Sequence, residues 1–241
     1  MSASRTHTIR CPRCSDEFDV ELWDSVNVAD RPSARDEVMS NRLNVVTCPT
    51  CELSFRVDKS VLYLDPSRGF AVWWAPEGAR EPERVHSEFR LLESQIEQHA
   101  GGIPLRLLLA FDRRELVERI FIAEAGLDER LVEYVKYMVL SRNPKRLDPA
   151  RHRLRFAGSP ADGTSADVDF VVEDTTTGRL EGVLRYPRAA FEQVEQMFGR
   201  SPAEALAELF PGPRPDAADL LRDGSEAGSE ASSPPDGEST E

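Results

Sequence analysis

The sequence has 241 residues, a hydrophobic fraction of 40% and a formal net charge of -13 at pH 7, so it is long enough to bury one or two hydrophobic cores. It contains no run of about 18 uncharged apolar residues, which excludes an ordinary transmembrane helix. The acidic balance disfavours nucleic acid as a partner, because binding to phosphate backbones needs clustered Lys and Arg.

The N-terminus lacks the features of a secretory signal, since its first ten residues contain neither an apolar segment nor a small-residue cleavage site. We therefore expect a cytoplasmic protein with no membrane partner. In that reducing compartment, four cysteines are more often metal ligands or catalytic thiols than two disulfides.

A zinc-ribbon-like β module is predicted over residues 8–80. Between its cysteine pairs, residues 32–43 predict a short helix, with Ser33 as the N-cap and Asp36 and Glu37 in the first turn. Alternating or β-rich stretches predict strands around this insertion: they are residues 18–23, 45–47, 54–57, 61–64 and 70–74.

The cysteines form two copies of Cys-Pro-X-Cys with 33 residues between them: Cys11 and Cys14, then Cys48 and Cys51. Two intervening residues let a tight turn direct both sulfurs toward one ion, and a second such turn completes a tetrahedron. Proline after the first cysteine of each pair restricts the backbone and favours that turn. We predict one structural Zn²⁺ held by all four cysteines, with iron as the alternative metal, because the ligand type alone does not separate the two.

A structural role is preferred over a catalytic one, because four thiolates fill the coordination sphere and leave no position for water or substrate. Structural zinc is worth about 10–16 kcal/mol in small peptides, enough to fold a module with a thin core. The competing interpretation is a redox Cys-X-X-Cys, which needs a thioredoxin-like βαβ context that neither pair shows. His7, four residues before Cys11, is interpreted as a bystander.

A helical segment is predicted over residues 84–142, completing the cysteine-containing region. Its first helix ends at Gly101-Gly102 and carries one apolar stripe: the stripe contains Val85, Phe89, Leu92, Ile96 and His99. Residues 105–111 are apolar and fit either a buried strand or a helix.

Two further helices follow in this segment. Asp112 is expected to cap the first of them, with Glu115 reaching back in a variant of the capping box. Gly126 ends that helix, and another is predicted from about Asp128 to Ser141.

Residues 150–210 predict three strands and two helices. The strands are residues 152–157, 167–173 and 179–186, and the last two form a hairpin. Pro187 is expected in the first turn of the next helix, and Ser201 is expected to open the last one as part of a capping box.

The C-terminal residues 211–241 contain two arginines and eight acidic residues and are rich in Pro, Gly and Ser. Such a composition buries too little apolar surface to offset chain entropy, so a disordered acidic tail is predicted. The fold class is therefore α+β, with the cysteine module first, a helical segment second and a small hairpin-helix segment third.

The chain resembles the CpXC proteins of bacteria and archaea over about residues 8–139. The similar features are the paired motifs, the helical insertion and three stretches, Leu62-Tyr-Leu-Asp65, Glu115-Leu-Val-Glu-Arg-Ile120 and Gly126-Leu-Asp-Glu-Arg-Leu-Val-Glu-Tyr-Val-Lys136. The resemblance implies that the four cysteines are zinc ligands in a family of uncharacterised function. Zinc knuckles often carry Gly after the second cysteine, where the backbone turns left-handed, but Ser15 and Glu52 stand there in this chain.

Three other groups of residues have both a structural and a functional interpretation. The pair Trp73-Trp74 offers a stacking platform, but core packing is preferred because no basic residues surround it. His99 on the apolar stripe is interpreted as a packed side chain. The acidic run from Asp16 to Glu21 lacks the Gly and terminal Glu of a calcium loop and is interpreted as a solvated strand edge.

No phosphate loop, Gly-X-Ser-X-Gly motif or dinucleotide fingerprint is present in the sequence. We therefore predict a non-enzymatic zinc-binding protein of the cytoplasm whose α+β remainder contacts a protein partner of unknown identity. One alternative is a nucleic-acid-associated or transcription-regulatory zinc ribbon. The other is an enzyme with a site between the ribbon and the helical segment.

Overall fold

The computed structural model describes residues 1–99, 105–158, 167–199 and 201–222. The chain divides into two compact units, Met1–Glu124 and Ala125–Glu241, and each unit is described by itself. The predicted α+β class is confirmed, with the cysteines gathered in the N-terminal part. Among the described residues, no helix has the length and apolar character needed to span a membrane.

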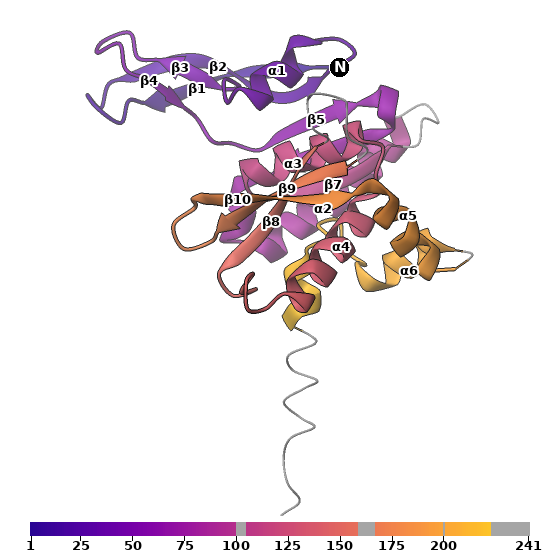
Figure 1. The fold of residues 1–241 in the computed structure, drawn as a ribbon. Coiled ribbons are helices and arrows are strands. Elements are labelled where there is room, and N and C mark those ends of the chain that lie inside the picture. Colours follow the sequence, from indigo (N-terminus) through magenta and orange to yellow (C-terminus); the bar gives the residue numbers. More distant parts are fainter. Residues whose placement is uncertain (100–104, 159–166, 200, 223–241) are drawn as a thin grey trace, which may run out of the picture. The chain divides into compact units, whose positions relative to one another are not determined.

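The first unit contains a five-stranded mixed sheet in the order β1-β2-β5-β6-β7 (Figure 1). The strands are β1 (Ala3–Arg10), β2 (Glu17–Asn27), β5 (Val61–Asp65), β6 (Phe70–Trp74) and β7 (Arg106–Ala110). β1 pairs with β2 and β5 with β6 in antiparallel fashion, whereas β2 pairs with β5 and β6 with β7 in parallel. The apolar residues 105–111, which fitted either a strand or a helix, therefore contain the strand β7.

Helices cover both faces of this sheet. One face packs against α1 (Ser33–Met39) and α3 (Arg113–Glu124), and the other packs against α2 (Pro82–His99). Because successive side chains of a strand point to opposite faces, Val72 of β6 faces α1 and α3, whereas the preceding Ala71 faces α2. This alternation gives the unit a buried core on each side of its sheet.

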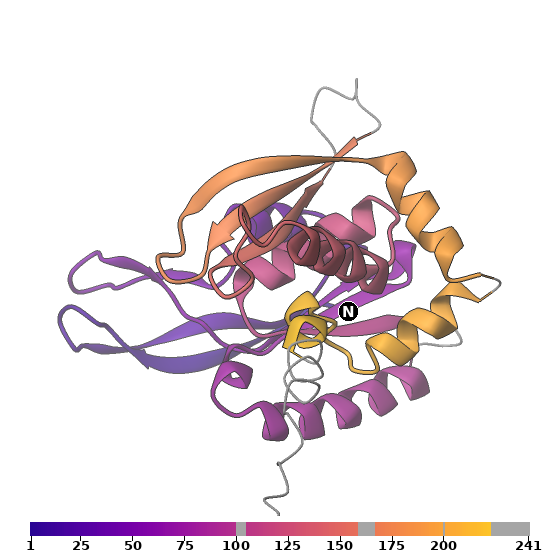
Figure 2. The ribbon, with the colours of Figure 1, turned by 60° about the horizontal axis from the view of Figure 1, so that its bottom comes forward.

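Strand β2 takes part in two structures. Its last residues, Ser25 to Asn27, pair with β5 in the main sheet, while the residues from Glu17 to Ser25 pair with β1, with a register shift near Ser25. The β1–β2 pair thus extends beyond the sheet as a hairpin. A second hairpin, formed by β3 (Val45–Thr47) and β4 (Ser54–Arg56), lies beside it (Figures 1 and 2).

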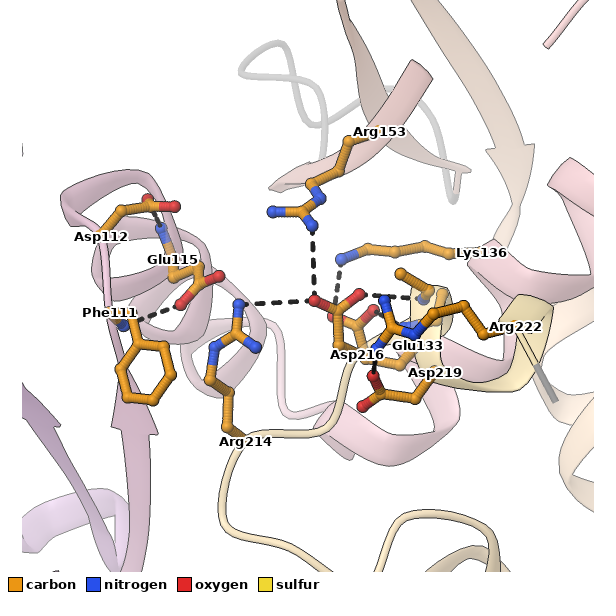
Figure 3. A network of polar contacts seen from close by, with 12 residues as sticks. Phe111, Asp112, Glu115, Glu133, Lys136, Arg153, Arg214, Asp216, Asp219 and Arg222 are labelled. Atoms are coloured by element: carbon orange, nitrogen blue, oxygen red, sulfur yellow. Dashed lines mark hydrogen bonds and ion pairs between the residues drawn. The ribbon is translucent and has the colours of Figure 1, made fainter. Parts of the chain in front are cut away.

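Two predicted helix starts have different outcomes. The prediction that Ser33 caps α1 is wrong: Pro32 occupies the N-cap position with φ -57° and ψ -31°, and no side chain caps the helix. Since Pro32 already has helical dihedral angles, Ser33 lies inside the first turn. The cap of α3 is confirmed, because the Asp112 carboxylate accepts a hydrogen bond from the Glu115 N–H at 2.9 Å (Figure 3).

The second unit contains an antiparallel sheet in the order β10-β9-β8. Its strands are β8 (His152–Gly158), β9 (Asp167–Asp174) and β10 (Leu180–Pro187), and its helices are α4 (Glu129–Arg142), α5 (Arg188–Met197) and α6 (Pro202–Leu209). All three strands and the β9–β10 hairpin are as predicted. An aromatic core joins sheet and helix, since the Phe170 ring stacks on Phe191 with ring centroids 6.3 Å apart.

The two helix starts predicted in this unit differ from expectation in detail. Pro187 is the N-cap of α5 instead of lying in its first turn. Ser201 stands at the N-cap of α6, but its side chain makes no capping hydrogen bond. The capping box predicted there is therefore wrong, although the helix itself begins at the expected position.

The disorder predicted for most of residues 211–241 does not extend to residues 211–222. Residues 217–222 are helical, and Ala217 is only 4% exposed. The Ala217 N–H donates to the Glu133 carboxylate of α4 at 3.0 Å (Figure 3). The composition of the segment could not predict this order, because it depends on a backbone hydrogen bond to a buried acceptor in another element. Residues 223–241 of the predicted tail lie outside the described residues.

Candidate metal centre

Both Cys-Pro-X-Cys motifs form the turns of hairpins. The first motif connects β1 to β2, and the second connects β3 to β4. The two turns share one hydrogen-bonding pattern: the Cys11 N–H donates to the Asp16 carbonyl at 2.8 Å, and the Cys48 N–H donates to the Leu53 carbonyl at 2.9 Å. Two segments that are distant in sequence therefore hold their cysteines in turns with the same backbone hydrogen bonds.

The residue after each second cysteine is left-handed. Ser15 has φ 61° and Glu52 has φ 57°, and each N–H donates to the carbonyl of the first cysteine of its motif at 3.0 Å. Glycine, which adopts this conformation at least cost, is absent from both positions. The turns thus have the left-handed residue of a zinc knuckle at the expense of some backbone strain.

The four sulfur atoms lie within 4.8 Å of one another. The shortest separations join the two motifs: the Sγ atoms of Cys11 and Cys51 are 3.6 Å apart, and those of Cys14 and Cys48 are also 3.6 Å apart. A regular tetrahedron with zinc–sulfur bonds of about 2.3 Å has edges of about 3.8 Å. The structure therefore brings all four predicted ligands together at a spacing that fits one tetrahedral metal ion.

The thiols differ in their readiness to ionise. Burial opposes the Cys11 thiolate, but the N–H groups of Cys14 and Arg13 and the neighbouring thiols outweigh it and lower its pKa to about 6. The Asp16 N–H lowers the pKa of Cys14, whereas partial loss of solvent around its sulfur and the neighbouring thiols raise it more, to about 12, although the residue as a whole is exposed. Cys11 thus forms a thiolate easily, while a second thiolate at Cys14 needs a cation to offset the repulsion between the two charges.

The first cysteine of each motif is interior and the second is nearer to solvent. Cys11 and Cys48 are buried, Cys14 is exposed and Cys51 is half-buried, and all four are free of disulfides. Behind the site, the hairpins pack through an edge-to-face contact between Phe18 of β2 and Phe55 of β4, with ring centroids 6.4 Å apart. This contact adds apolar packing to the junction of the two hairpins.

Asn44 positions the second hairpin and was not identified from the sequence. It is buried, with φ 57°. Its Oδ1 accepts a hydrogen bond from the Trp23 N–H at 2.8 Å, its Nδ2 donates to the Trp23 carbonyl at 3.2 Å, and its own carbonyl accepts from the Val57 N–H at 3.0 Å. The available signal was the residue type, because Asn is enriched among left-handed residues.

The alternative sites considered from the sequence are structural where the structure describes them. Trp74 is buried in the core, and Trp73 packs partly buried on the α2 side of the sheet, which confirms core packing. Glu17, Asp19 and Glu21 share one exposed face of the β1–β2 pair, where the Asp19 carboxylate accepts from the Thr8 hydroxyl at 2.6 Å.

The two histidines singled out from the sequence do not join the cysteines. His7 is not part of the cysteine cluster, and its Nε2 lies 3.1 Å from Lys59 Nζ. The side chain of His99 lies outside the described residues. The candidate metal centre therefore consists of four sulfur donors.

The fold and this cluster define a protein with a four-cysteine site at the adjoining turns of two hairpins. A family model described as CpXC protein matches residues 9–136, which is more than half of the chain. The chain therefore belongs to the CpXC protein family, as its motifs predicted. No curated protein and no solved structure shows a significant match.

Proposed function

We propose that the protein binds one structural Zn²⁺ through Cys11, Cys14, Cys48 and Cys51. The observation that carries this proposal is the spacing of the four sulfurs, which lie within 4.8 Å of one another on two equivalent turns. Four thiolates complete a tetrahedral coordination sphere, and such a closed set serves folding instead of catalysis. The chemistry supplied by the ion is the cross-linking of two hairpins that are far apart in sequence.

The second hairpin has the greater need for such a cross-link. β3 and β4 pair through three residues each, and an isolated two-stranded hairpin of that size is marginally stable in water. Binding energies of about 10–16 kcal/mol for structural zinc far exceed the stability of so small a hairpin. The ion therefore stabilises the turn and holds it against the β1–β2 hairpin.

A metal analysis of untagged protein tests this proposal. Mass spectrometry of the native chain is expected to find about one equivalent of zinc per chain. Iron at the same stoichiometry, with the visible absorption of a ferric tetrathiolate, supports the alternative metal. Less than about half an equivalent of either metal, with all thiols free to react, contradicts the proposal.

A matched pair of variants separates the thiols from the turn. Cys48→Ser removes one buried sulfur and is expected to abolish stoichiometric metal binding. Arg13→Gln changes the variable position of the first motif, where the side chain is exposed, and is expected to retain the metal. Retention of zinc by Cys48→Ser, or its loss from Arg13→Gln, contradicts the assignment of the ligands.

We further propose that the protein is cytoplasmic and non-enzymatic and acts by contacting another protein. Free cysteines suit a reducing compartment, and a closed sulfur site leaves no coordination position for a substrate. Affinity capture with wild type, Arg13→Gln and Cys48→Ser as baits tests the contact. A specific protein retained by the first two and lost by the third supports the proposal, whereas recovery of nucleic acid or of no specific protein contradicts it.

A further inference from the structure

The four cysteines differ in how open they are to a reagent in the solvent. Cys14 is exposed, whereas Cys11 and Cys48 are buried and Cys51 is half-buried. Coordination to a metal keeps a cysteine sulfur deprotonated at neutral pH, because only the thiolate is a ligand. Oxidation of a cysteine follows its thiolate character and its exposure. In the metal-loaded chain, Cys14 therefore has both of the properties that direct an oxidant to one sulfur.

A second sulfur is in position to form a disulfide with Cys14. Cys48 Sγ, from the other motif, lies 3.6 Å from Cys14 Sγ, and the Sγ atoms of Cys11 and Cys51 are separated by the same 3.6 Å. A disulfide bond is about 2.0 Å long, so the sulfurs of either pair need to approach by about 1.6 Å. Since these shortest separations cross between the motifs, the disulfide that the geometry favours joins the two hairpins.

Two contacts beside the sulfurs fix the second turn against the first. At the turns themselves, the Thr50 hydroxyl of the second motif donates to the Asp16 carboxylate that follows the first motif. Behind the sulfurs, the Phe18 ring packs edge-to-face on Phe55. The two hairpins lie side by side (Figures 1 and 2). An oxidised Cys14 would therefore form with a thiolate of the other motif already next to it.

We propose that Cys14 is an oxidation site, and that a peroxide converts Cys14 and Cys48 into a disulfide which replaces the metal ion as the link between the two hairpins. This inference rests on the proposed function, because it starts from the metal-loaded chain. The oxidant is hydrogen peroxide or another small peroxide that reaches an exposed thiolate.

The reaction takes place in two steps. In the first, the Cys14 thiolate attacks one oxygen of hydrogen peroxide: an S–O bond forms, the O–O bond breaks, and the hydroxide that leaves takes up a proton to become water. In the second, the Cys48 thiolate attacks the sulfur of the sulfenic acid: an S–S bond forms, the S–O bond breaks, and the hydroxide again takes up a proton. The two thiolates lose two electrons, which reduce one peroxide to two waters.

The disulfide removes half of the ligands. Cys11 and Cys51 are left, and two thiolates are too few to complete a tetrahedral site, so the bound metal is lost as the disulfide forms. The new bond still joins the turn of the first hairpin to the turn of the second. Reduction by a dithiol restores both thiolates and with them the metal site. Metal content thus becomes a reversible record of oxidation.

Peroxide treatment of the zinc-loaded full chain tests the proposal. Zinc content is measured first; hydrogen peroxide is then added in a small molar excess, and released zinc is followed with a colorimetric chelator. One equivalent of zinc is expected to be released for each disulfide formed, and dithiothreitol with added zinc is expected to reverse the change. The chelator alone, without peroxide, is the control and should release no zinc over the same time.

Mass spectrometry identifies the cysteines that react. Dimedone, which traps sulfenic acids, is expected to label Cys14 before any other cysteine. Trypsin cleaves after Arg10 and Arg13 and so separates Cys11 from Cys14, while fragment ions distinguish the two cysteines of the peptide 43–56. The first cross-link is expected between Cys14 and Cys48. Hydrogen exchange over residues 45–56 should also be slower in the oxidised chain than in the reduced, metal-free chain, because a covalent link replaces the ion.

The outcomes separate this inference from the proposed function. A chain that contains zinc and keeps both the zinc and its four reduced thiols under peroxide overturns the inference alone. A chain that contains no metal before oxidation overturns both. A first disulfide within one motif, or between Cys11 and Cys51, overturns the assignment of the oxidation site, as does dimedone found first on a cysteine other than Cys14.

Discussion

The side chain of Asn44 pairs with both main-chain groups of Trp23, accepting from its N–H at 2.8 Å and donating to its carbonyl at 3.2 Å. The amide therefore replaces one backbone rung of a β-ladder between β2 and the chain entering β3. Since Asn44 lies four residues before Cys48, this pairing determines where the second cysteine turn lies relative to the first. The arrangement of the metal centre thus depends on Asn44, a residue outside both Cys-Pro-X-Cys motifs.

Replacement of Asn44 by Gly should destabilise the first unit. Glycine keeps the left-handed backbone but removes both hydrogen bonds to Trp23, so the free energy of unfolding is expected to fall by roughly 1–3 kcal/mol. Urea denaturation of the metal-loaded protein measures the change. The control is Asn41→Gly, at an exposed residue with φ 62° whose Oδ1 accepts a surface hydrogen bond from Arg56, where a change within about 0.5 kcal/mol is expected. Equal losses in the two variants would contradict the positioning role.

Glycine after the second cysteine should stabilise the protein. Ser15 and Glu52 adopt the left-handed region with φ 61° and 57°, at a backbone cost of about 1–2 kcal/mol each that glycine avoids. After allowing for the greater entropy of unfolded glycine, Ser15→Gly and Glu52→Gly are each expected to add up to about 1 kcal/mol. Thermal unfolding measures this gain.

The same substitution in an extended position gives the matched control. Ser54→Gly in β4 places glycine in a strand and is expected to lower stability by about 0.5–1 kcal/mol. The prediction is therefore that the change in stability has opposite signs at the two positions, a gain for Ser15→Gly and a loss for Ser54→Gly. If Ser15→Gly lowered the melting temperature as Ser54→Gly does, the left-handed strain at the turns would be disproved.

Metal removal should unfold the two hairpin ends and leave the main sheet intact. β3 and β4 pair through three residues each, whereas Val26 of β2 and Ala34 and Val38 of α1 belong to the same core as Val72 of β6. From the sequence, zinc binding was expected to supply the energy that folds the whole module. The shared core limits the predicted unfolding to the part beyond the sheet. Hydrogen exchange after chelation is expected to rise over residues 8–16 and 45–56 and to stay low in β6. A uniform increase, or none, would exclude this account.

The Asp174 carboxylate should make stability depend on pH in the acid range. It accepts from the N–H groups of Thr177 at 2.8 Å and Thr176 at 2.9 Å, and from Arg151 at 2.6 Å. The Thr177 N–H first, and then Arg151, lower its pKa from 3.8 to about 2. A carboxyl whose pKa is lower when folded stabilises the fold above the unfolded value, and this contribution is lost as the pH falls through the folded value.

The wild-type urea midpoint is therefore expected to fall between pH 3.8 and about 2. Asp174→Asn has no charge to lose, so its midpoint should start lower at neutral pH and decline less over that window. Titration of both proteins by circular dichroism provides the comparison. Parallel pH curves for the two would show that another carboxyl governs the acid transition.

Removing only one partner of the buried ion pair between Lys136 and Glu133 should greatly lower the free energy of unfolding. Lys136 Nζ lies 2.7 Å from Glu133 Oε1, with side-chain exposures of 4% and 5% (Figure 3). Lys136→Met leaves a buried carboxylate without this counter-charge, and a loss of about 3–5 kcal/mol is expected. The double variant Glu133→Gln with Lys136→Met should lose less, because it removes both charges.

Lys145→Met removes a lysine at an exposed position and is the control for Lys136→Met, with an expected change within about 0.5 kcal/mol. Denaturant unfolding of all three variants measures the differences. If the double variant were as unstable as Lys136→Met alone, the cost would come from packing and not from an uncompensated charge.

Strands that bury alternate apolar residues were predicted correctly from that alternation. Strand β1 was missed because it has no such alternation. β5 and β6 bury every second side chain or more, which leaves a period that is visible in the sequence. β1 has a mostly exposed surface, so hydrophobicity carries no signal for it. β1 is a strand because its backbone pairs antiparallel with that of β2, and this pairing does not depend on apolar side chains.

Spacing along the chain determined the membership of the candidate site, because two residues between paired cysteines and a proline after the first define each turn locally. Apolar periodicity likewise predicted most helices and strands, because an element that buries one face carries apolar residues at the period of the helix or strand. The convergence of the two turns, the bridge from Asn44 to Trp23 and the burial of Ala217 against Glu133 were decided only by the tertiary structure. Each of these depends on a hydrogen-bonding group or a sulfur atom meeting a partner distant in sequence, and pairing of that kind leaves no periodic trace in either partner.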